Sequence, residues 1–282
     1  MTTRPGDPRP PSGTLAEMRE ALQSGVGAPA RIALALLAAA TASTASASTA
    51  STASAEDRWR SVESENFEVL SDASPRRIAD TVRELESLHA VLGRIASRPR
   101  SGPKTLVVAF ADNDGFRRYS PWPDRRRVAG YFAQALLRNY IVLDLSSGAG
   151  SRSIYHEYLH EFASTNFPDV PLWFNEGLAE WFEARALGKR GLSAGEWAVL
   201  REAARTTPLL GFYELSPPSF VGYAPETARL AYLQSYAMID YLVRLSGERR
   251  LRDFVRDVVR TGRLDAPFRK TYRSEIQELP DR

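Results

Sequence analysis

The sequence predicts an α+β fold, in which a small mixed sheet is followed by a helical region. The apolar runs 105–110 and 139–145 have the length and the branched side chains of buried strands. Helical periodicity dominates from about residue 154 onwards, after the second of these runs. Strands that precede helices in this way favour an α+β domain over a doubly wound sheet.

The elements of the first half are justified by local signals. Residues 66–70 are expected to form a short strand, and Ser74 and Pro75 provide the N-cap and first-turn proline of a helix that reaches about residue 95. Residues 130–135 are expected to pair with 139–145 as a hairpin. The apolar stripe of the helix is formed by Ile78, Val82, Leu85 and Leu92, and His89 continues it, so we expect a structural role for His89.

The helices of the second half follow the hairpin. The helix around 154–162 is apolar on most of its circumference and is expected inside the protein. Pro171 is expected to begin a second helix that ends near Ala184. A proline-rich connection over 206–225 comes next, and two further helices are each closed by a glycine, at Gly247 and Gly262.

Composition excludes several classes of function. The chain has 282 residues, 43% of them hydrophobic, which fits one sizeable domain or two small ones. The net charge is only +3 and the basic residues are scattered, so no nucleic-acid partner is expected. Arg125, Arg126 and Arg127 are interpreted as a solvated loop, with substrate binding as the alternative. The absence of cysteine excludes disulfides, thiolate metal sites and cysteine nucleophiles.

The N-terminal residues have the layout of an export signal. Arg31 is followed by the apolar stretch 32–40 and then by small residues. The stretch is shorter than the roughly 20 residues that a membrane-spanning helix needs. We therefore predict a signal peptide and low-complexity linker over 1–55, cleavage after Ala55, a periplasmic or secreted protein, and no stable membrane span after cleavage. The alternative is a disordered Ala/Ser/Thr tail.

Two of the three histidines lie in one short motif on the helix around 154–162. The motif is His156-Glu157-Tyr158-Leu159-His160, and its spacing of four places both imidazoles on one face of the helix. Glu157 lies one position further round, where it can reach a water molecule on a shared metal ion without binding the metal. Satisfied core histidines are the alternative reading.

A catalytic zinc site needs a third protein ligand and an open position for water. Glu176 lies on the next predicted helix, in the segment Trp173-Phe174-Asn175-Glu176-Gly177-Leu178-Ala179-Glu180-Trp181. Two antiparallel helices joined by a short loop can present such side chains to one metal ion. Glu180, one turn further on, is expected to accept a hydrogen bond from the second ring nitrogen of a ligating histidine. Ordinary surface glutamates are the alternative for both.

The combination H-E-x-x-H and N-E-G-x-x-E resembles the gluzincin zinc metallopeptidases, and within them the peptidase MA-like domain, with distant similarity to thermolysin and aminopeptidase N. The resemblance is specific over about 154–182 and implies a zincin-type catalytic domain over 56–282. It also implies that His156, His160 and Glu176 bind Zn²⁺ and that Glu157 is the general base.

Two comparisons with aminopeptidases refine this expectation. Their amine-binding motif G-x-M-E-N has no counterpart, since residues 130–134 read Gly-Tyr-Phe-Ala-Gln, so exopeptidase action is not expected. The segment 231–235 resembles the aminopeptidase segment whose tyrosine stabilises the oxyanion, which makes Tyr232 the candidate for that role. Core packing, as for Tyr236 one turn away, is the alternative.

The expected activity is zinc-dependent hydrolysis of peptide bonds in an extracytoplasmic protein or peptide, by a metal-activated water with Glu157 as base. Two alternatives use the same fold, a non-catalytic zinc-binding module and a cell-wall amide hydrolase. The intact Glu157 argues against the first, because a binding module needs no carboxylate beside the metal. The sequence leaves the oligomeric state open.

Overall fold

The computed structural model describes most of the chain after residue 58. The described residues are 59–95, 104–120, 128–134, 138–146, 149–167, 170–206, 209–211, 213–217 and 219–281. The predicted signal peptide and linker, the cleavage site after Ala55 and the arginines 125–127 lie outside these ranges. In the described part, no helix is both long enough and apolar enough to cross a membrane.

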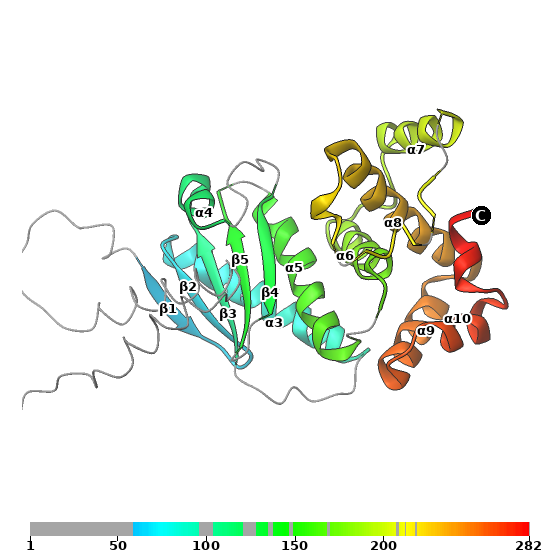
Figure 1. The fold of residues 1–282 in the computed structure, drawn as a ribbon. Helices are drawn as coiled ribbons and strands as arrows, with labels where there is room; N and C mark the ends of the chain where they lie inside the picture. The colour runs from blue at the N-terminus through cyan, green and yellow to red at the C-terminus, as the bar shows by residue number, and fades with distance from the viewer. Residues whose placement is uncertain are drawn as a thin grey trace, which may run out of the picture.

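A five-stranded mixed sheet forms one side of the molecule, in the order β1-β2-β3-β5-β4 (Figure 1). Its strands are β1 (Arg60–Glu63), β2 (Phe67–Ser71), β3 (Thr105–Phe110), β4 (Gly130–Gln134) and β5 (Asn139–Asp144). The three central strands are parallel, whereas β1 and β4 run antiparallel to their neighbours. The predicted mixed sheet and the β4–β5 hairpin are therefore confirmed.

The strand β1 is additional to the predicted elements. All four of its residues are exposed, and its sequence Arg-Ser-Val-Glu has no apolar alternation of the kind that indicates a half-buried strand. It forms by pairing with β2, where Val62 lies opposite Val69. Backbone hydrogen bonds to a neighbouring strand, rather than burial of its own side chains, place it in the sheet.

Helix α3 (Pro75–Gly93) joins β2 to the parallel strand β3, as the crossover between parallel strands requires. It begins as predicted: Pro75 lies in the first turn, and the hydroxyl of Ser74 accepts a hydrogen bond from the backbone N–H of Arg77 at 3.4 Å. His89 is held by a hydrogen bond and by packing: its Nδ1 lies 2.7 Å from the hydroxyl of Tyr158, and its ring packs edge-on against Phe67.

Eight helices and two short 3-10 segments are assigned in the described residues. After α3 they are α4 (Asn113–Tyr119), α5 (Ala149–Asn166), α6 (Leu172–Ala186), α7 (Ala194–Thr206), α8 (Pro225–Ser246), α9 (Glu248–Thr261) and α10 (Asp265–Tyr272), with 3-10 turns at Phe220–Gly222 and Ile276–Asp281. Helices α4, α7 and α10 are additional to the predicted ones. The glycine ends of α8 and α9 are confirmed, since Gly247 and Gly262 both have positive φ.

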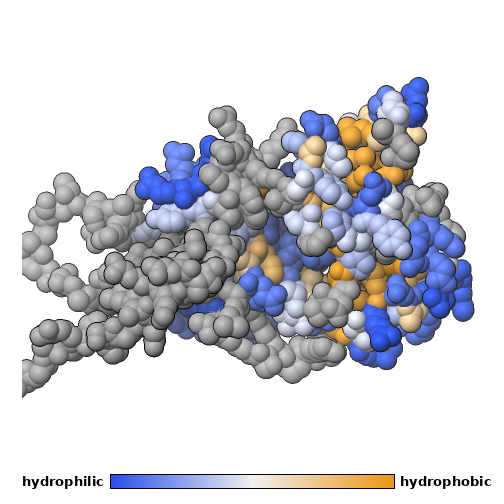
Figure 2. Space-filling view, in the orientation of Figure 1, coloured by the Kyte–Doolittle hydropathy of each residue, from blue (hydrophilic) through white to orange (hydrophobic). Residues whose placement is uncertain are grey.

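The alternation of side chains along the strands produces two cores. Phe67, Val107 and Ile141 face α3 and α5 on one side of the sheet, whereas Val108 and Val142 lie on the opposite face with residues of α4. The first core continues between α5, α6, α8 and α9 into the helical region. Apolar residues are visible between these helices, and hydrophilic residues cover the outside around α9 and α10 (Figure 2).

Helix α5 is central to the architecture (Figure 1). It packs on β4, β5 and α3 on one side and on α6 on the other, and α6 packs in turn on α8. The motif helix therefore lies at the boundary between the sheet and the helical region. This α+β arrangement confirms the predicted fold class.

Candidate metal centre

The two helices α5 and α6 bring the candidate ligands together. Their connection is short, which makes them antiparallel neighbours. The contacts agree: His160 in the second half of α5 lies beside Glu176 near the start of α6, while Arg152 near the start of α5 lies beside Glu183 near the end of α6. The side chains of His156 and His160 on α5 therefore form one column, which faces a second column formed by Glu176 and Glu183 on α6.

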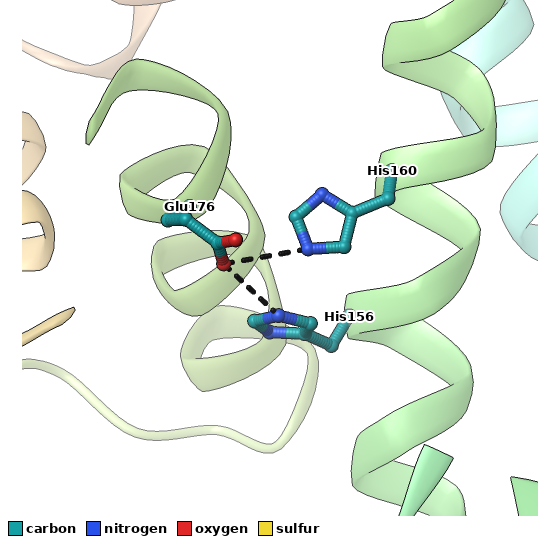
Figure 3. A group of neighbouring side chains, drawn as sticks. All are labelled: His156, His160 and Glu176. Atoms are coloured by element: carbon teal, nitrogen blue, oxygen red, sulfur yellow. Dashed lines mark ion pairs between the residues drawn. The ribbon is translucent and has the colours of Figure 1, made fainter. Parts of the chain in front are cut away.

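Three atoms converge between these columns (Figure 3). The Nε2 atoms of His156 and His160 each lie 3.4 Å from Oε2 of Glu176. The two imidazole rings are nearly perpendicular, with centroids 4.7 Å apart. The side chains are 15%, 13% and 12% exposed, respectively, so the cluster is largely buried and keeps some access to solvent.

The spacing fits a tetrahedral zinc site. Metal–ligand bonds of about 2.1 Å at the tetrahedral angle place neighbouring ligand atoms about 3.4 Å apart. An N–H···O hydrogen bond is shorter, at about 2.9 Å. Oε2 of Glu176 is buried and has no hydrogen-bond partner among the described residues. Two imidazole nitrogens and one carboxylate oxygen form the donor set that zinc takes in catalytic sites, so these residues fit the ion.

The electrostatics of the cluster follow from burial and proximity. Burial alone lowers the pKa of His156, but its contacts with Glu176 and Glu183 outweigh this effect and raise the pKa well above its usual value. The pKa of His160 is raised in the same way, with Glu176 as the main cause that opposes burial. Burial raises the pKa of Glu176, but the two histidines hold it well below its usual range. The carboxylate is therefore ionised at neutral pH.

Glu157 lies beside this cluster and against the sheet. A Cβ atom at Gly130 of β4 would stand 3.2 Å from Cγ of Glu157 and 2.9 Å from Cβ of Ser153, so the absence of a side chain at Gly130 lets α5 approach the strand. Burial is the main influence on Glu157 and raises its pKa, while His156 and His160 partly oppose it. A carboxylate whose pKa is shifted toward neutrality is suited to accept and return a proton.

The opposite side of His156 has two carboxylates. Its Nδ1 lies 3.6 Å from Oε2 of Glu183 and 3.9 Å from Oε1 of Glu180. Glu180 is thus placed near the ring nitrogen for which it was predicted, although Glu183 is nearer. The other oxygen of Glu183 accepts a hydrogen bond from Nε of Arg152 at 2.9 Å. Glu183 and Arg152 are additional to the predicted site residues. The spacing of seven from Glu176 to Glu183, two helical turns, is the sequence signal that indicates a shared face.

The rear of α6 rests on α8 at very short range. A Cβ atom at Gly177, next to the candidate ligand Glu176, would stand 2.4 Å from the backbone oxygen of Ser235. Only a glycine permits this approach. The contact sets the depth at which α6 lies in the helical region, and with it the position of the carboxylate of Glu176.

The two candidate tyrosines of α8 differ in their surroundings. Tyr232 is half-buried, and its ring packs edge-on against Phe220. Tyr236 is buried, and burial together with Asp240 raises its pKa to about 12. The role of Tyr232 as an oxyanion donor stays a prediction.

Comparison with known proteins places the chain in a family. The model of the Peptidase MA superfamily matches residues 140–282. No sequence relative was found among the curated proteins. A solved structure of an M1 zinc metallopeptidase variant from Deinococcus radiodurans is similar at 14% identity and a TM-score of 0.36, over 79% of this chain and 50% of that one.

This chain thus spans half the length of that M1 chain, and a likeness of this size says nothing about activity. The match to the family model, in contrast, is a match of sequence. It covers just over half of the chain, including α5 and α6 with all three converging side chains. The protein belongs to the Peptidase MA superfamily.

Proposed function

We propose that the protein is a zinc-dependent peptidase that hydrolyses peptide bonds of an extracytoplasmic protein or peptide. The observation that carries the proposal is the convergence of Nε2 of His156, Nε2 of His160 and Oε2 of Glu176 at the spacing of zinc ligands. Membership of the Peptidase MA superfamily supports the same activity. The predicted signal peptide over 1–55 supports the extracytoplasmic location.

In this proposal His156, His160 and Glu176 hold the ion. A bound zinc ion supplies a Lewis acid that acidifies water and polarises the scissile carbonyl. Glu157 takes the proton from the attacking water and returns it to the leaving amine, a double use that suits a carboxylate with a raised pKa. The partial burial of the site limits bulk water around the reacting groups, which strengthens these electrostatic interactions.

The sheet offers a place for an extended substrate. β4 stands at the end of the strand order and packs on α5, the helix that carries Glu157. An extended peptide can add to such an edge as a further strand. Residues 130–134 provide no carboxylate to hold a free amino terminus, which favours cleavage within a chain over removal of terminal residues.

Tyr232 is proposed to donate a hydrogen bond to the oxyanion that forms during attack. Its helix packs directly on α6, and its side chain is only half-buried. Tyr232→Phe is expected to lower kcat about 100-fold with little change in KM, because the lost interaction exists mainly in the transition state. Tyr236→Phe is the matched control and is expected to retain kcat. Equal kcat in all three proteins would assign Tyr232 to packing.

The decisive experiment measures metal and activity separately. Residues 56–282 are purified as the natural sequence, His160→Ala and Glu157→Gln, and zinc per chain is determined by elemental mass spectrometry. We expect one zinc per chain in the natural protein and in Glu157→Gln, and none in His160→Ala. Cleavage of casein is expected only for the natural protein, because Glu157→Gln keeps the ligands and removes the base.

The possible results separate the proposal from its alternatives. No zinc in the natural protein after reconstitution would overturn the proposal. An active Glu157→Gln would refute the assignment of the base. Zinc without casein cleavage leaves two alternatives, and hydrolysis of peptidoglycan fragments then separates a cell-wall amide hydrolase from a non-catalytic zinc-binding module.

A further inference from the structure

The facing sides of α5 and α6 extend beyond the three converging ligands. Arg152, His156 and His160 follow one another at intervals of four along α5. Glu176, Glu180 and Glu183 lie on one side of α6. Because the helices are antiparallel, the arginine meets the last glutamate, and His156 lies between that pair and Glu176.

We propose that Glu183, held in place by Arg152, is the carboxylate that accepts the Nδ1–H of His156 and thereby directs Nε2 of this histidine toward the metal position. Both are positioning residues, because neither contacts the substrate or the ion. The inference deepens the proposed function and rests on it for the identity of the metal. The arrangement of the three side chains is independent of that identity.

Three observations favour Glu183 over Glu180. Oε2 of Glu183 is the nearer oxygen, at 3.6 Å from Nδ1 against 3.9 Å for Glu180. The side chain of Glu183 is 10% exposed, whereas that of Glu180 is 35% exposed, so water competes less for Glu183. The other oxygen of Glu183 is bound by Arg152 at 2.9 Å, and a charge-assisted hydrogen bond of this kind fixes the carboxylate rotamer.

The position of Arg152 makes this restraint effective. It lies one turn before His156 on α5, so the group that holds Glu183 and the histidine that uses it move together with one helix. The contact from Nδ1 to Oε2 is long for a hydrogen bond at 3.6 Å. Contacts of this kind in ligand-free active sites shorten when the reacting complex assembles.

The second histidine provides an internal contrast. Nδ1 of His160 is buried and has no hydrogen-bond partner among the described residues. In the described residues, the Nδ1 of His160 therefore lacks the carboxylate contact that the Nδ1 of His156 makes with Glu183. Outer hydrogen bonds of this type typically change metal affinity 10–100-fold. The loss of Glu183 should therefore act on the metal through His156 alone.

Zinc affinity tests the proposal. The dissociation constant is measured by competition with a chromophoric chelator for the natural protein, Glu183→Gln, Glu180→Gln, Arg152→Ala and Arg152→Lys. We expect Glu183→Gln to bind zinc about 10–100-fold more weakly. Arg152→Ala is expected to lose about 10-fold and Arg152→Lys to recover most of that loss, since lysine restores the charge. Glu180→Gln should stay within about 3-fold of the natural protein.

Arg256→Ala is the matched control, because it removes an exposed arginine–aspartate pair on α9. Thermal melting of every variant shows whether the fold is kept. A larger loss of affinity in Glu180→Gln than in Glu183→Gln would overturn the inference. So would an Arg152→Ala protein that binds zinc as well as Arg256→Ala does.

A second measurement does not need zinc. In protein labelled with ¹⁵N-histidine, the Nδ1–H proton of His156 is expected to exchange slowly with water, and to exchange fast in Glu183→Gln and Arg152→Ala. If the natural protein binds no zinc, the proposed function fails and this proton still decides the inference. If zinc binds but exchange is equally fast in all variants, the inference fails and the function stands.

Discussion

A glycine lies at each of two close contacts beside the site, one between β4 and α5 and the other between α6 and α8. The two glycines differ in the atoms that surround them. On the sheet side, Gly130 of β4 faces α5, and a Cβ there would stand 2.9 Å from Cβ of Ser153. On the helical side, Gly177 of α6 faces α8, and a Cβ there would stand 2.4 Å from the backbone oxygen of Ser235. Ordinary contacts begin near 3.4 Å, so an added methyl group overlaps by about 0.5 Å in the first case and about 1 Å in the second.

The difference separates the surroundings of Glu157, the proposed base, from those of Glu176, the candidate metal ligand. The sheet-side contact lies beside Glu157, and its neighbours are side chains. The helical-side contact lies beside Glu176, and its nearest neighbour is backbone, which cannot turn away. The position of the candidate ligand on α6 is therefore the more rigidly determined of the two. A substitution at Gly177 should therefore act mainly on zinc binding, and one at Gly130 mainly on turnover.

Gly177→Ala is expected to have the largest effect. Overpacking of this kind typically costs about 3 kcal/mol, offset by about 1 kcal/mol of better helix propensity, so we expect a net loss of about 2 kcal/mol in the free energy of unfolding. Zinc affinity should fall as well, because α6 must move with Glu176. Denaturant unfolding and chelator competition measure the two effects.

The control for this substitution is Gly195→Ala on α7, where nothing lies within 4 Å of the added methyl group. It should leave stability unchanged or raise it by up to about 1 kcal/mol. Equal stabilities for Gly177→Ala and Gly195→Ala would remove the contrast between the two sides of the site.

Gly130→Ala is expected to act on turnover more than on stability. A shift of β4 or α5 by about 0.5 Å costs about 1 kcal/mol in the free energy of unfolding. The same shift displaces Glu157, and kcat should fall about 10-fold, since misplacement by 1 Å can cost about 100-fold. Zinc content should stay at the natural value. If Gly130→Ala lost zinc but kept its kcat per bound ion, the contact of β4 with α5 would position the metal ligands rather than Glu157.

The dependence of stability on pH separates ionic contacts from packing and gives the smallest effect. His156 and His160 have raised pKa values, so they bind protons more tightly in the folded chain than in the unfolded one. Their protonation stabilises the metal-free fold fully below about pH 6.5, and this contribution is lost as pH rises through the raised values. The pKa of Glu176 is lowered, so its contribution is present at neutral pH and is lost only in acid.

Melting curves of the chelator-treated protein should therefore show a lower Tm as pH rises above about 6.5. The loss should be smaller in His156→Gln, which lacks one of the titrating groups. A Tm that rises over the same pH range in the chelator-treated natural protein would contradict the ion-pair account of this cluster.

Local signals in the sequence were sufficient for much of the fold. The run 105–110 matches β3 at both ends, and Ser74 with Pro75 begins α3 as expected. Each of these elements is determined by neighbouring residues, through burial of a continuous apolar run or through a cap. The strand β1 could not be predicted in this way, because its exposed residues are held by pairing with β2. The formation of β1 thus depends on another segment of the chain, the strand β2.

In the site, too, some features follow from one segment of the sequence and others from the packing of two segments. The spacing of His156 and His160 is a property of one helix, so the sequence alone determined that the two imidazoles share a face, with Glu157 one position further round. The antiparallel packing of α5 on α6 decided that Oε2 of Glu176 meets both histidines at 3.4 Å. It also decided that Glu183, rather than Glu180, lies nearer to Nδ1 of His156. Helical periodicity orders residues within one segment, but the distance between two helices depends on packing, which here includes the contact of Gly177 with the backbone of Ser235.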